Sequence, residues 1–329
     1  MKNALLILTL LISMTLSAFG KETFKIRYLF KSSYPSRPNY AVYENDEKIS
    51  ELTSLSDRKI LKIRFDKNNP DNLLFAEKNE NRYSVRKFNF LTNKESVIFE
   101  FEKEIYKFMA FTENAFYWCE KCEKNNEPQI LYEYDALTGE SKKIFETEDI
   151  LKKHGERYQS GFISRVMADD EYVFLHCYGT FADNPGSFLI DRKTLKSKRI
   201  STTCKKSQEG YSTAWFDNPF TDGKKLKSYA FDFSEFCTIT DLKTLEKTKI
   251  KFKKRHEGQG GPIVLLSDDY ILVPLAIKPF SDSIKNGLFK SIWTVQYTVF
   301  DIKKNKSVFG GHITRTNEKY ILDAVLLKK

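Results

Sequence analysis

Three segments of the chain carry similar sets of polar residues at a regular spacing. They read HGERYQSGF (154–162), SQEGYSTAWF (207–216) and RHEGQGGPI (255–263), and a fourth segment, FGGHITR (309–315), adds a histidine. Each of the first three has a glutamate beside glycine and beside a tyrosine, glutamine or arginine. Carboxylate, imidazole and guanidinium groups bind polar ligands or move protons when a fold brings them to one cavity. These segments therefore predict a polar ligand site, provided that the fold gathers them.

The ligand-binding hypothesis gives each of these residue types a role. The arginines bind anions through two parallel hydrogen bonds, the aromatic rings stack on a ligand, and the glutamates, the histidine and the glutamine supply hydrogen bonds or proton transfer. The predicted ligand-binding residues are Glu156, Arg157, Tyr158, Glu209, Tyr211, Trp215, Arg255, His256 and Gln259. A structural alternative stays open, in which Glu156, Glu209 and Glu257 accept backbone N–H groups and join neighbouring repeats.

A metal-binding variant of this site would use His154, His256 and His312, with Gln259 or Gln208 completing the shell. The spacing of these histidines matches no common metal-binding motif, so the sequence predicts neither a metal nor another cofactor. The sequence also contains no G-x-S-x-G motif and no phosphate-binding glycine motif. We therefore assign no catalytic residue and favour a protein that is not an enzyme.

A recurring unit of strand, polar turn and strand should position these segments. The four clearest copies span residues 131–146, 188–200, 238–252 and 298–310. An aspartate ends the first strand of each copy, at Asp135, Asp191, Asp241 and Asp301. Its side chain is expected to hold the turn by hydrogen bonds to the backbone. Residues 88–101 form the same unit with Leu91 in place of the aspartate, and residues 40–52 form a shortened copy.

A second hairpin lies between these units and consists of a short apolar strand, an acidic or asparagine-containing turn, and an aromatic-rich strand. Its turns are marked by Asp71, Glu113, Asp169, Asp222, Asp268 and Asn317. The markers recur about every fifty residues, which is the spacing of a repeat architecture. Two hairpins per period give four strands per period, repeated about six times.

This pattern resembles the β-propeller superfamily over nearly the whole chain, and the layout is similar to that of six-bladed exported propellers. The resemblance implies one all-β domain over residues 21–329, with four-stranded blades in a ring that strands from both termini close. The strand at 23–31 has no clear place, so seven blades stay open beside six. In such a ring, the connections from the outermost strand of one blade to the innermost strand of the next gather at one rim. The polar segments would meet there.

The ends and the charge of the chain indicate its compartment and partners. Residues 1–20 combine Lys2, an apolar stretch and small residues at Ala18 and Gly20, which predicts a signal peptide and a periplasmic or secreted protein. The chain has 54 Lys and Arg against 44 Asp and Glu, a formal net charge of +10. This excess is spread thinly, which argues against nucleic-acid binding. No later segment is long and apolar enough to predict a membrane span.

Two further motifs receive structural interpretations. Cys119 and Cys122 form a C-x-x-C pair that follows a strand and opens into a polar loop, which predicts a local disulfide or two free thiols rather than thioredoxin-type chemistry. His176 lies inside the apolar strand YVFLHCY and is expected in the core or the channel.

The sequence as a whole predicts an exported, monomeric, non-enzymatic β-propeller. We expect it to bind a protein or an anionic glycan or envelope component through loops on one rim. The alternative is a carbohydrate-active enzyme, a lyase or a hydrolase, that uses rim carboxylates or a histidine-bound divalent metal.

Overall fold

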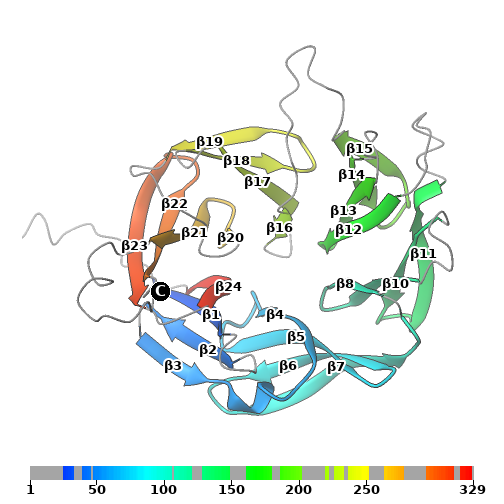
Figure 1. Cartoon of the computed structure of the whole chain (residues 1–329), viewed down its shortest axis with the longest axis horizontal. Helices are drawn as coiled ribbons and strands as arrows, with labels where there is room; N and C mark the ends of the chain where they lie inside the picture. Colours follow the sequence, from blue (N-terminus) through cyan, green and yellow to red (C-terminus); the bar gives the residue numbers. More distant parts are fainter. Residues whose placement is uncertain are drawn as a thin grey trace, which may run out of the picture.

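The strands form antiparallel sheets that are arranged in a ring (Figure 1), and the space enclosed by the innermost strands is here called the channel. The computed structural model describes residues 25–32, 39–45, 47–105, 107–120, 128–148, 161–179, 186–201, 219–221, 226–232, 236–251, 263–277, 294–314 and 319–327. Within these ranges there are six sheets of four strands each. The predicted fold, a six-bladed β-propeller, is confirmed.

The strands of each blade follow one another from the channel outward. Blade 1 contains β24 (Lys319–Leu327), β1 (Lys25–Ser32), β2 (Asn39–Glu44) and β3 (Glu47–Glu51), and blade 2 contains β4 (Ile60–Phe65), β5 (Asn72–Asn79), β6 (Arg82–Asn89) and β7 (Lys94–Glu102). Blade 3 contains β8 (Lys107–Phe111), β9 (Ala115–Cys119), β10 (Ile130–Asp135) and β11 (Glu140–Glu146), and blade 4 contains β12 (Gly161–Ala168), β13 (Tyr172–Gly179), β14 (Gly186–Asp191) and β15 (Ser197–Ser201). Blade 5 contains β16 (Pro219–Thr221), β17 (Leu226–Asp232), β18 (Phe236–Asp241) and β19 (Lys247–Lys251), and blade 6 contains β20 (Val264–Leu265), β21 (Tyr270–Ile277), β22 (Thr294–Asp301) and β23 (Lys306–Thr314). A short 3-10 helix, η1 (Thr53–Leu55), lies between β3 and β4.

Strands from both ends of the chain close the ring, as expected. The C-terminal strand β24 pairs antiparallel with β1 and becomes the innermost strand of blade 1. Figure 1 shows the red strand β24 beside the blue strand β1. The strand that the sequence could not place, at 23–31, is therefore β1, the second strand of blade 1. Its position leaves six blades and removes the seven-bladed alternative.

The core lies between neighbouring blades, where alternate side chains of facing sheets meet. Aromatic rings fill the interface of blades 2 and 3, and the ring of Phe101 stacks on Tyr134 with centroids 4.7 Å apart. Phe116 packs edge-on against Phe101 at 5.0 Å. Flat rings fill the wedge between twisted sheets and bury much apolar surface per residue. This interface uses part of the chain's aromatic content of 14%.

The turns between the third and fourth strands are held as predicted. Oδ1 of Asp191 accepts the N–H groups of Lys193 (3.0 Å) and Thr194 (2.7 Å). Asp135, Asp241 and Asp301 likewise accept backbone N–H groups two or three residues further on. One alignment in the sequence was wrong, because the residue that holds the turn of blade 2 is Asn89 and not Leu91. Oδ1 of Asn89 accepts the N–H groups of Leu91 (3.2 Å) and Thr92 (2.9 Å), since an amide oxygen serves as well as a carboxylate.

The markers of the second hairpin are mostly right. Asp71, Glu113, Asp169 and Asp268 lie between the first and second strands of their blades, and Asp222 falls outside the described residues between β16 and β17. Asn317 was a wrong marker, because it falls between β23 and β24 and thus between two blades. A turn within a blade and a connection between two blades both appear in the sequence as a strand, a polar segment and a strand. The local pattern therefore could not distinguish one from the other.

The alternation of strands gives the ring two different faces. The connections from first to second and from third to fourth strand are short and leave from one end of the blades, here called the tight-turn face. The connections from second to third strand, and from one blade to the next, leave from the opposite end, here called the long-loop face. The longer connections of the chain, such as 202–218 and 278–293, all belong to the long-loop face.

Buried polar contacts join neighbouring blades. Asp323 of β24 accepts the backbone N–H of Phe65 in blade 2 (2.7 Å) and pairs with Nζ of Lys67 (3.2 Å). Arg192 of blade 4 reaches Glu133 of blade 3 with two hydrogen bonds of 3.1 and 3.3 Å. Because Asp323 sits on the C-terminal strand, its contacts tie the closure of the ring to the next blade.

Replacing Asp323 should destabilise the ring far more than breaking an exposed contact between blades. The Asp323→Ala change leaves the buried N–H of Phe65 without an acceptor and removes the carboxylate paired with Lys67, whose ammonium keeps only the carbonyl of Ala324. We therefore expect a loss of about 3 kcal/mol in the free energy of unfolding. The control is Glu171→Ala, which breaks the exposed pair of Glu171 and Lys243 between blades 4 and 5. It should leave the urea midpoint nearly unchanged. Equal midpoints for the two variants would contradict a structural role of Asp323 in closure.

A leucine in one tight turn offers a second test. Leu195 has a φ of 56° and is 43% exposed, so Leu195→Gly relieves a strained backbone at little loss of packing. We expect a gain of about 0.5–1 kcal/mol in the free energy of unfolding. Leu137→Gly, in the matching turn of blade 3, is the control because Leu137 is 83% exposed and lacks a positive φ. The Leu137→Gly change should lower the free energy of unfolding slightly. If Leu195→Gly lowers the free energy of unfolding as well, the backbone at Leu195 is not strained.

Candidate functional site

The residues of the predicted rim site lie outside the described residues. These are Glu156, Arg157, Tyr158, Glu209, Tyr211, Trp215, Arg255, His256 and Gln259. The three connections that contain them run from β11 to β12, from β15 to β16 and from β19 to β20, each from an outermost to an innermost strand. All three connections leave from the long-loop face. The arrangement of the side chains themselves stays a prediction.

One part of the rim prediction was wrong. Residues 309–314 were expected in a connection, yet they belong to β23, the outermost strand of blade 6, where His312 is paired with Gln296 of β22. The alternating residues of FGGHIT continue the strand across its glycines, which sequence inspection took for a loop. His154 and His256 fall outside the described residues. The part of the chain that is described contains no group of three or more ligating side chains arranged for a metal ion.

The remaining chemical candidates are buried in the blades. His176 of β13 is in the core, as expected, with Nδ1 2.9 Å from Oγ of Ser187. Burial raises the pKa of the Cys177 thiol well above its usual range and that of Cys237 to about 12, so both stay protonated and unreactive. Cys119 is buried in β9, and Cys122 lies outside the described residues, so the pairing of the C-x-x-C motif stays a prediction.

The central channel holds a cavity of about 1500 Å³ near the tight-turn face. Its walls come from the innermost strands β4, β8, β12, β20 and β24 and from the turns that follow four of them. Six of the lining residues are cationic: Lys25, Arg27, Lys62, Arg64, Lys67 and Lys87. Seven are carboxylates: Glu44, Asp71, Glu113, Asp170, Asp268, Asp269 and Asp323. The cavity is therefore strongly charged with little net charge.

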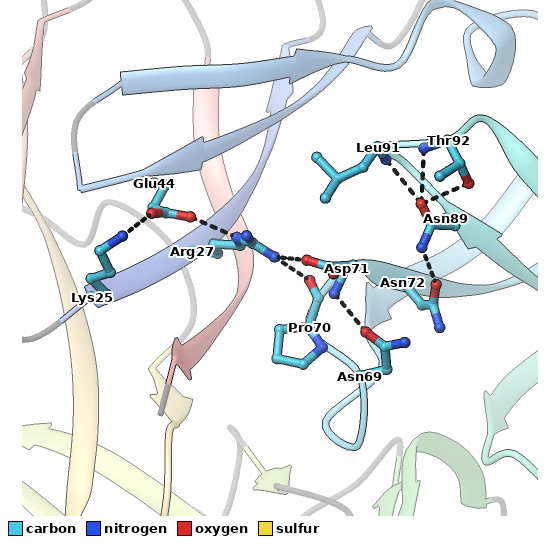
Figure 2. A network of polar contacts seen from close by, with 10 residues as sticks. All are labelled: Lys25, Arg27, Glu44, Asn69, Pro70, Asp71, Asn72, Asn89, Leu91 and Thr92. Carbon is cyan, nitrogen blue, oxygen red and sulfur yellow. Dashed lines mark hydrogen bonds and ion pairs between the residues drawn. The ribbon is translucent and has the colours of Figure 1, made fainter. Parts of the chain in front are cut away.

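Most of the cations at this cavity are paired. Arg27 of β1 donates to Glu44 at 2.9 Å, to the carbonyl of Pro70 at 3.2 Å and to Asp71 (Figure 2). Lys87 lies 3.0 Å from the buried Asp66. Burial alone would raise the pKa of Asp66, but the Lys87 ammonium and two backbone N–H groups lower it. The contacts of Arg27 link β1, and that of Lys87 links β6, to the turn after β4, and together they stabilise this wall of the cavity.

Lys62 and Arg64 form an exception. They point to the same side of β4, because their partners in β5, Ala76 and Leu74, both pack in the interface of blades 2 and 3. The guanidinium of Arg64 lies over the ring of Phe111, 5.3 Å from its centroid. Among the described residues, neither side chain makes a hydrogen bond or an ion pair, and Nε of Arg64 is buried without a partner. The site thus holds two unpaired cations.

The surroundings of this pair oppose its positive charge. The pKa of Lys62 is lowered to about 8, mainly by burial and further by the positive charge of Arg64, while the negative charge of Asp323 partly offsets the shift. Burial also lowers the pKa of Arg64, against the attraction of Asp323, Glu113 and other carboxylates. Both side chains keep some contact with the channel, since each is only half-buried by surface area. A pair of poorly solvated cations facing a cavity can bind an anion.

Sequence inspection missed Lys62 and Arg64 although a signal was present. The segment ILKIRF (60–65) alternates charged with apolar residues, which by itself is typical of any strand with one solvated face. Its meaning changes once the strand is known to be innermost, because the charged side then lies at the inner end of the interface between blades 2 and 3, beside the cavity, instead of against bulk water. The assignment of strand position within each blade was the missing step.

Comparison with known proteins supports no family assignment. No protein-family model and no curated protein matches the sequence. Among solved structures, the chain is similar to an oligogalacturonate lyase in complex with manganese, with 15% identity over 85% of this chain and 72% of that chain at a TM-score of 0.47. It is also similar to a chain of a nidogen–laminin complex, with 7% identity, coverage of 92% and 98%, and a TM-score of 0.46. The third similar structure is dipeptidyl peptidase 4 of Porphyromonas gingivalis, with 13% identity over 89% of this chain and 51% of that chain at a TM-score of 0.40. At these scores the similarities carry no argument about function.

The pKa of Lys62 predicts how stability depends on pH. The folded protein disfavours the charged form, so the cost of Lys62 is fully present below about pH 8 and fades as pH rises toward the ordinary value of 10.5. The melting temperature of the native chain should therefore rise relative to that of Lys62→Met between pH 8 and pH 10. Lys94→Met on the exposed edge of β7 is the control and should show a constant difference. A constant difference for Lys62→Met would rule out the shift.

Proposed function

We propose that this protein is an exported binding propeller without catalytic activity, which takes up a protein or an anionic glycan or envelope component on its long-loop face. The observation that carries the proposal is the difference between the two faces. Short turns held by Asp135, Asp191 and Asp241 close one face, while the connections that contain the predicted rim residues leave from the other. Rigid scaffolds carry their binding groups on such connections.

The scaffold meets the requirement of rigidity. Apolar clusters fill the interfaces between neighbouring blades, and ion pairs such as Arg192 with the buried Glu133 cross between them. Connections anchored on such strands lose less conformational freedom on binding than connections on a mobile scaffold. The net charge of +10 favours an acidic partner over a basic one by long-range attraction.

The experiment compares capture with stability. A triple variant, Arg157→Ala, Tyr211→Ala and His256→Ala, should lose capture of acidic polysaccharide and of envelope proteins in a pull-down, and its melting temperature should stay nearly unchanged. A double variant on the tight-turn face, Lys193→Ala with Lys303→Ala, removes two positive charges, at least as many as the triple variant removes, and should still capture. The mature chain recovered from the envelope should begin at Lys21, as removal of residues 1–20 requires.

Three results would contradict the proposal. Equal loss of capture in both variants would indicate non-specific attraction by net charge. A large fall in the melting temperature of the triple variant would favour the structural alternative for Glu156, Glu209 and Glu257. Turnover of an acidic oligosaccharide would instead favour the carbohydrate-active enzyme.

A further inference from the structure

The channel contains a second candidate site, distinct from the long-loop face. Lys62 and Arg64 face a cavity of about 1500 Å³ and have no side-chain partner among the described residues. We propose that these two side chains bind the oxyanion group of a small ligand, a carboxylate or a phosphate, that enters from the tight-turn face. The site goes beyond the proposed function and does not depend on it.

The first argument is the contrast with neighbouring cations. Lys67 pairs with Asp323, Lys87 with Asp66, and Arg27 with Glu44. The wall of the cavity thus supplies a carboxylate for each of these cations and none for Lys62 and Arg64. An unpaired cation away from bulk water is costly unless something else solvates it. An oxyanion of the ligand would supply the missing acceptors.

The second argument is the geometry around Arg64. Its guanidinium lies over the ring of Phe111, 5.3 Å from the ring centroid, a contact that restricts its movement, and its Nε is buried without an acceptor among the described residues. An ordered guanidinium donates two parallel hydrogen bonds to a carboxylate or a phosphate at little cost in conformational entropy. Lys62, two residues earlier on the same side of β4, adds a second positive charge beside it.

The third argument limits the size and charge of the ligand. Glu113 and Asp170 lie in the turns after β8 and β12, line the cavity, and make no ion pair among the described residues. They act on Arg64 through space, since both raise its pKa against the effect of burial. A polyanion that reached through the mouth would meet these carboxylates and be repelled. The site therefore fits a single oxyanion on a ligand whose other end is neutral or positively charged.

The test measures thermal stability with and without inorganic phosphate at constant ionic strength. Phosphate should raise the melting temperature of the native chain by about 2 °C once its concentration exceeds the dissociation constant about tenfold. Arg64→Met and Lys62→Met should lose this response. Without phosphate, both variants should melt at or above the temperature of the native chain, because each removes an unpaired cation.

The matched control is Lys87→Met, which removes a cation from the same cavity that is paired with Asp66. It should melt at a lower temperature and keep its response to phosphate. Phosphorus NMR gives a second measurement, in which the phosphate line broadens with the native chain and with Lys87→Met but not with Arg64→Met. Acetate should also raise the melting temperature of the native chain, but by less than phosphate, because it carries a single negative charge. Long-chain polyphosphate should bind no more tightly than phosphate.

Two outcomes would overturn the proposal. If Arg64→Met and Lys62→Met both melt below the native chain and respond to phosphate as it does, the two cations serve the fold and bind no anion. If polyphosphate binds far more tightly than phosphate and Arg64→Met does not weaken it, anions bind elsewhere on the surface.

Discussion

The pairing of β24 with β1 is the constraint on which the rest of the structure depends. It joins the two ends of the chain in one blade, and Asp323 on β24 extends this contact to Phe65 and Lys67 of blade 2. Without it, β20 and β4 would each lack a neighbouring inner strand, since both contact β24. The innermost edges of the six sheets face the centre of the ring, and the channel exists only while the ring is closed.

Closure also separates the roles of the two faces. Because the strands alternate in direction, the turns from first to second and from third to fourth strand fall on one face, and every connection between blades falls on the other. The short turns are locally determined, since Asp191 and Asp241 need only the N–H groups two and three residues ahead. The longer connections have no such local rule, so their sequences are free to carry binding groups without cost to the blades.

The parts of the fold that the sequence could predict are those with local physical causes. The Asx turns and the alternation of apolar residues are written within a few neighbouring positions, so the outer hairpins and the number of blades were predicted correctly. Asn317 and His312 were misplaced because a turn within a blade and a connection between blades share the same local pattern. Lys62 and Arg64 could not be recognised, since their meaning depends on which strand lines the channel, a property of the closed ring.

The channel combines two opposing electrostatic arrangements in a small space. Asp66 and Asp323 are buried with direct cationic partners, Lys87 and Lys67, although Asp323 also attracts Lys62 and Arg64 through space. Lys62 and Arg64 instead face carboxylates that act only through space, with open volume between them. Paired charges stabilise a wall, whereas separated charges leave an electric field across a cavity. That field runs from the cations on β4 toward Glu113 and Asp170, so the proposed ligand would place its negative end beside Lys62 and Arg64.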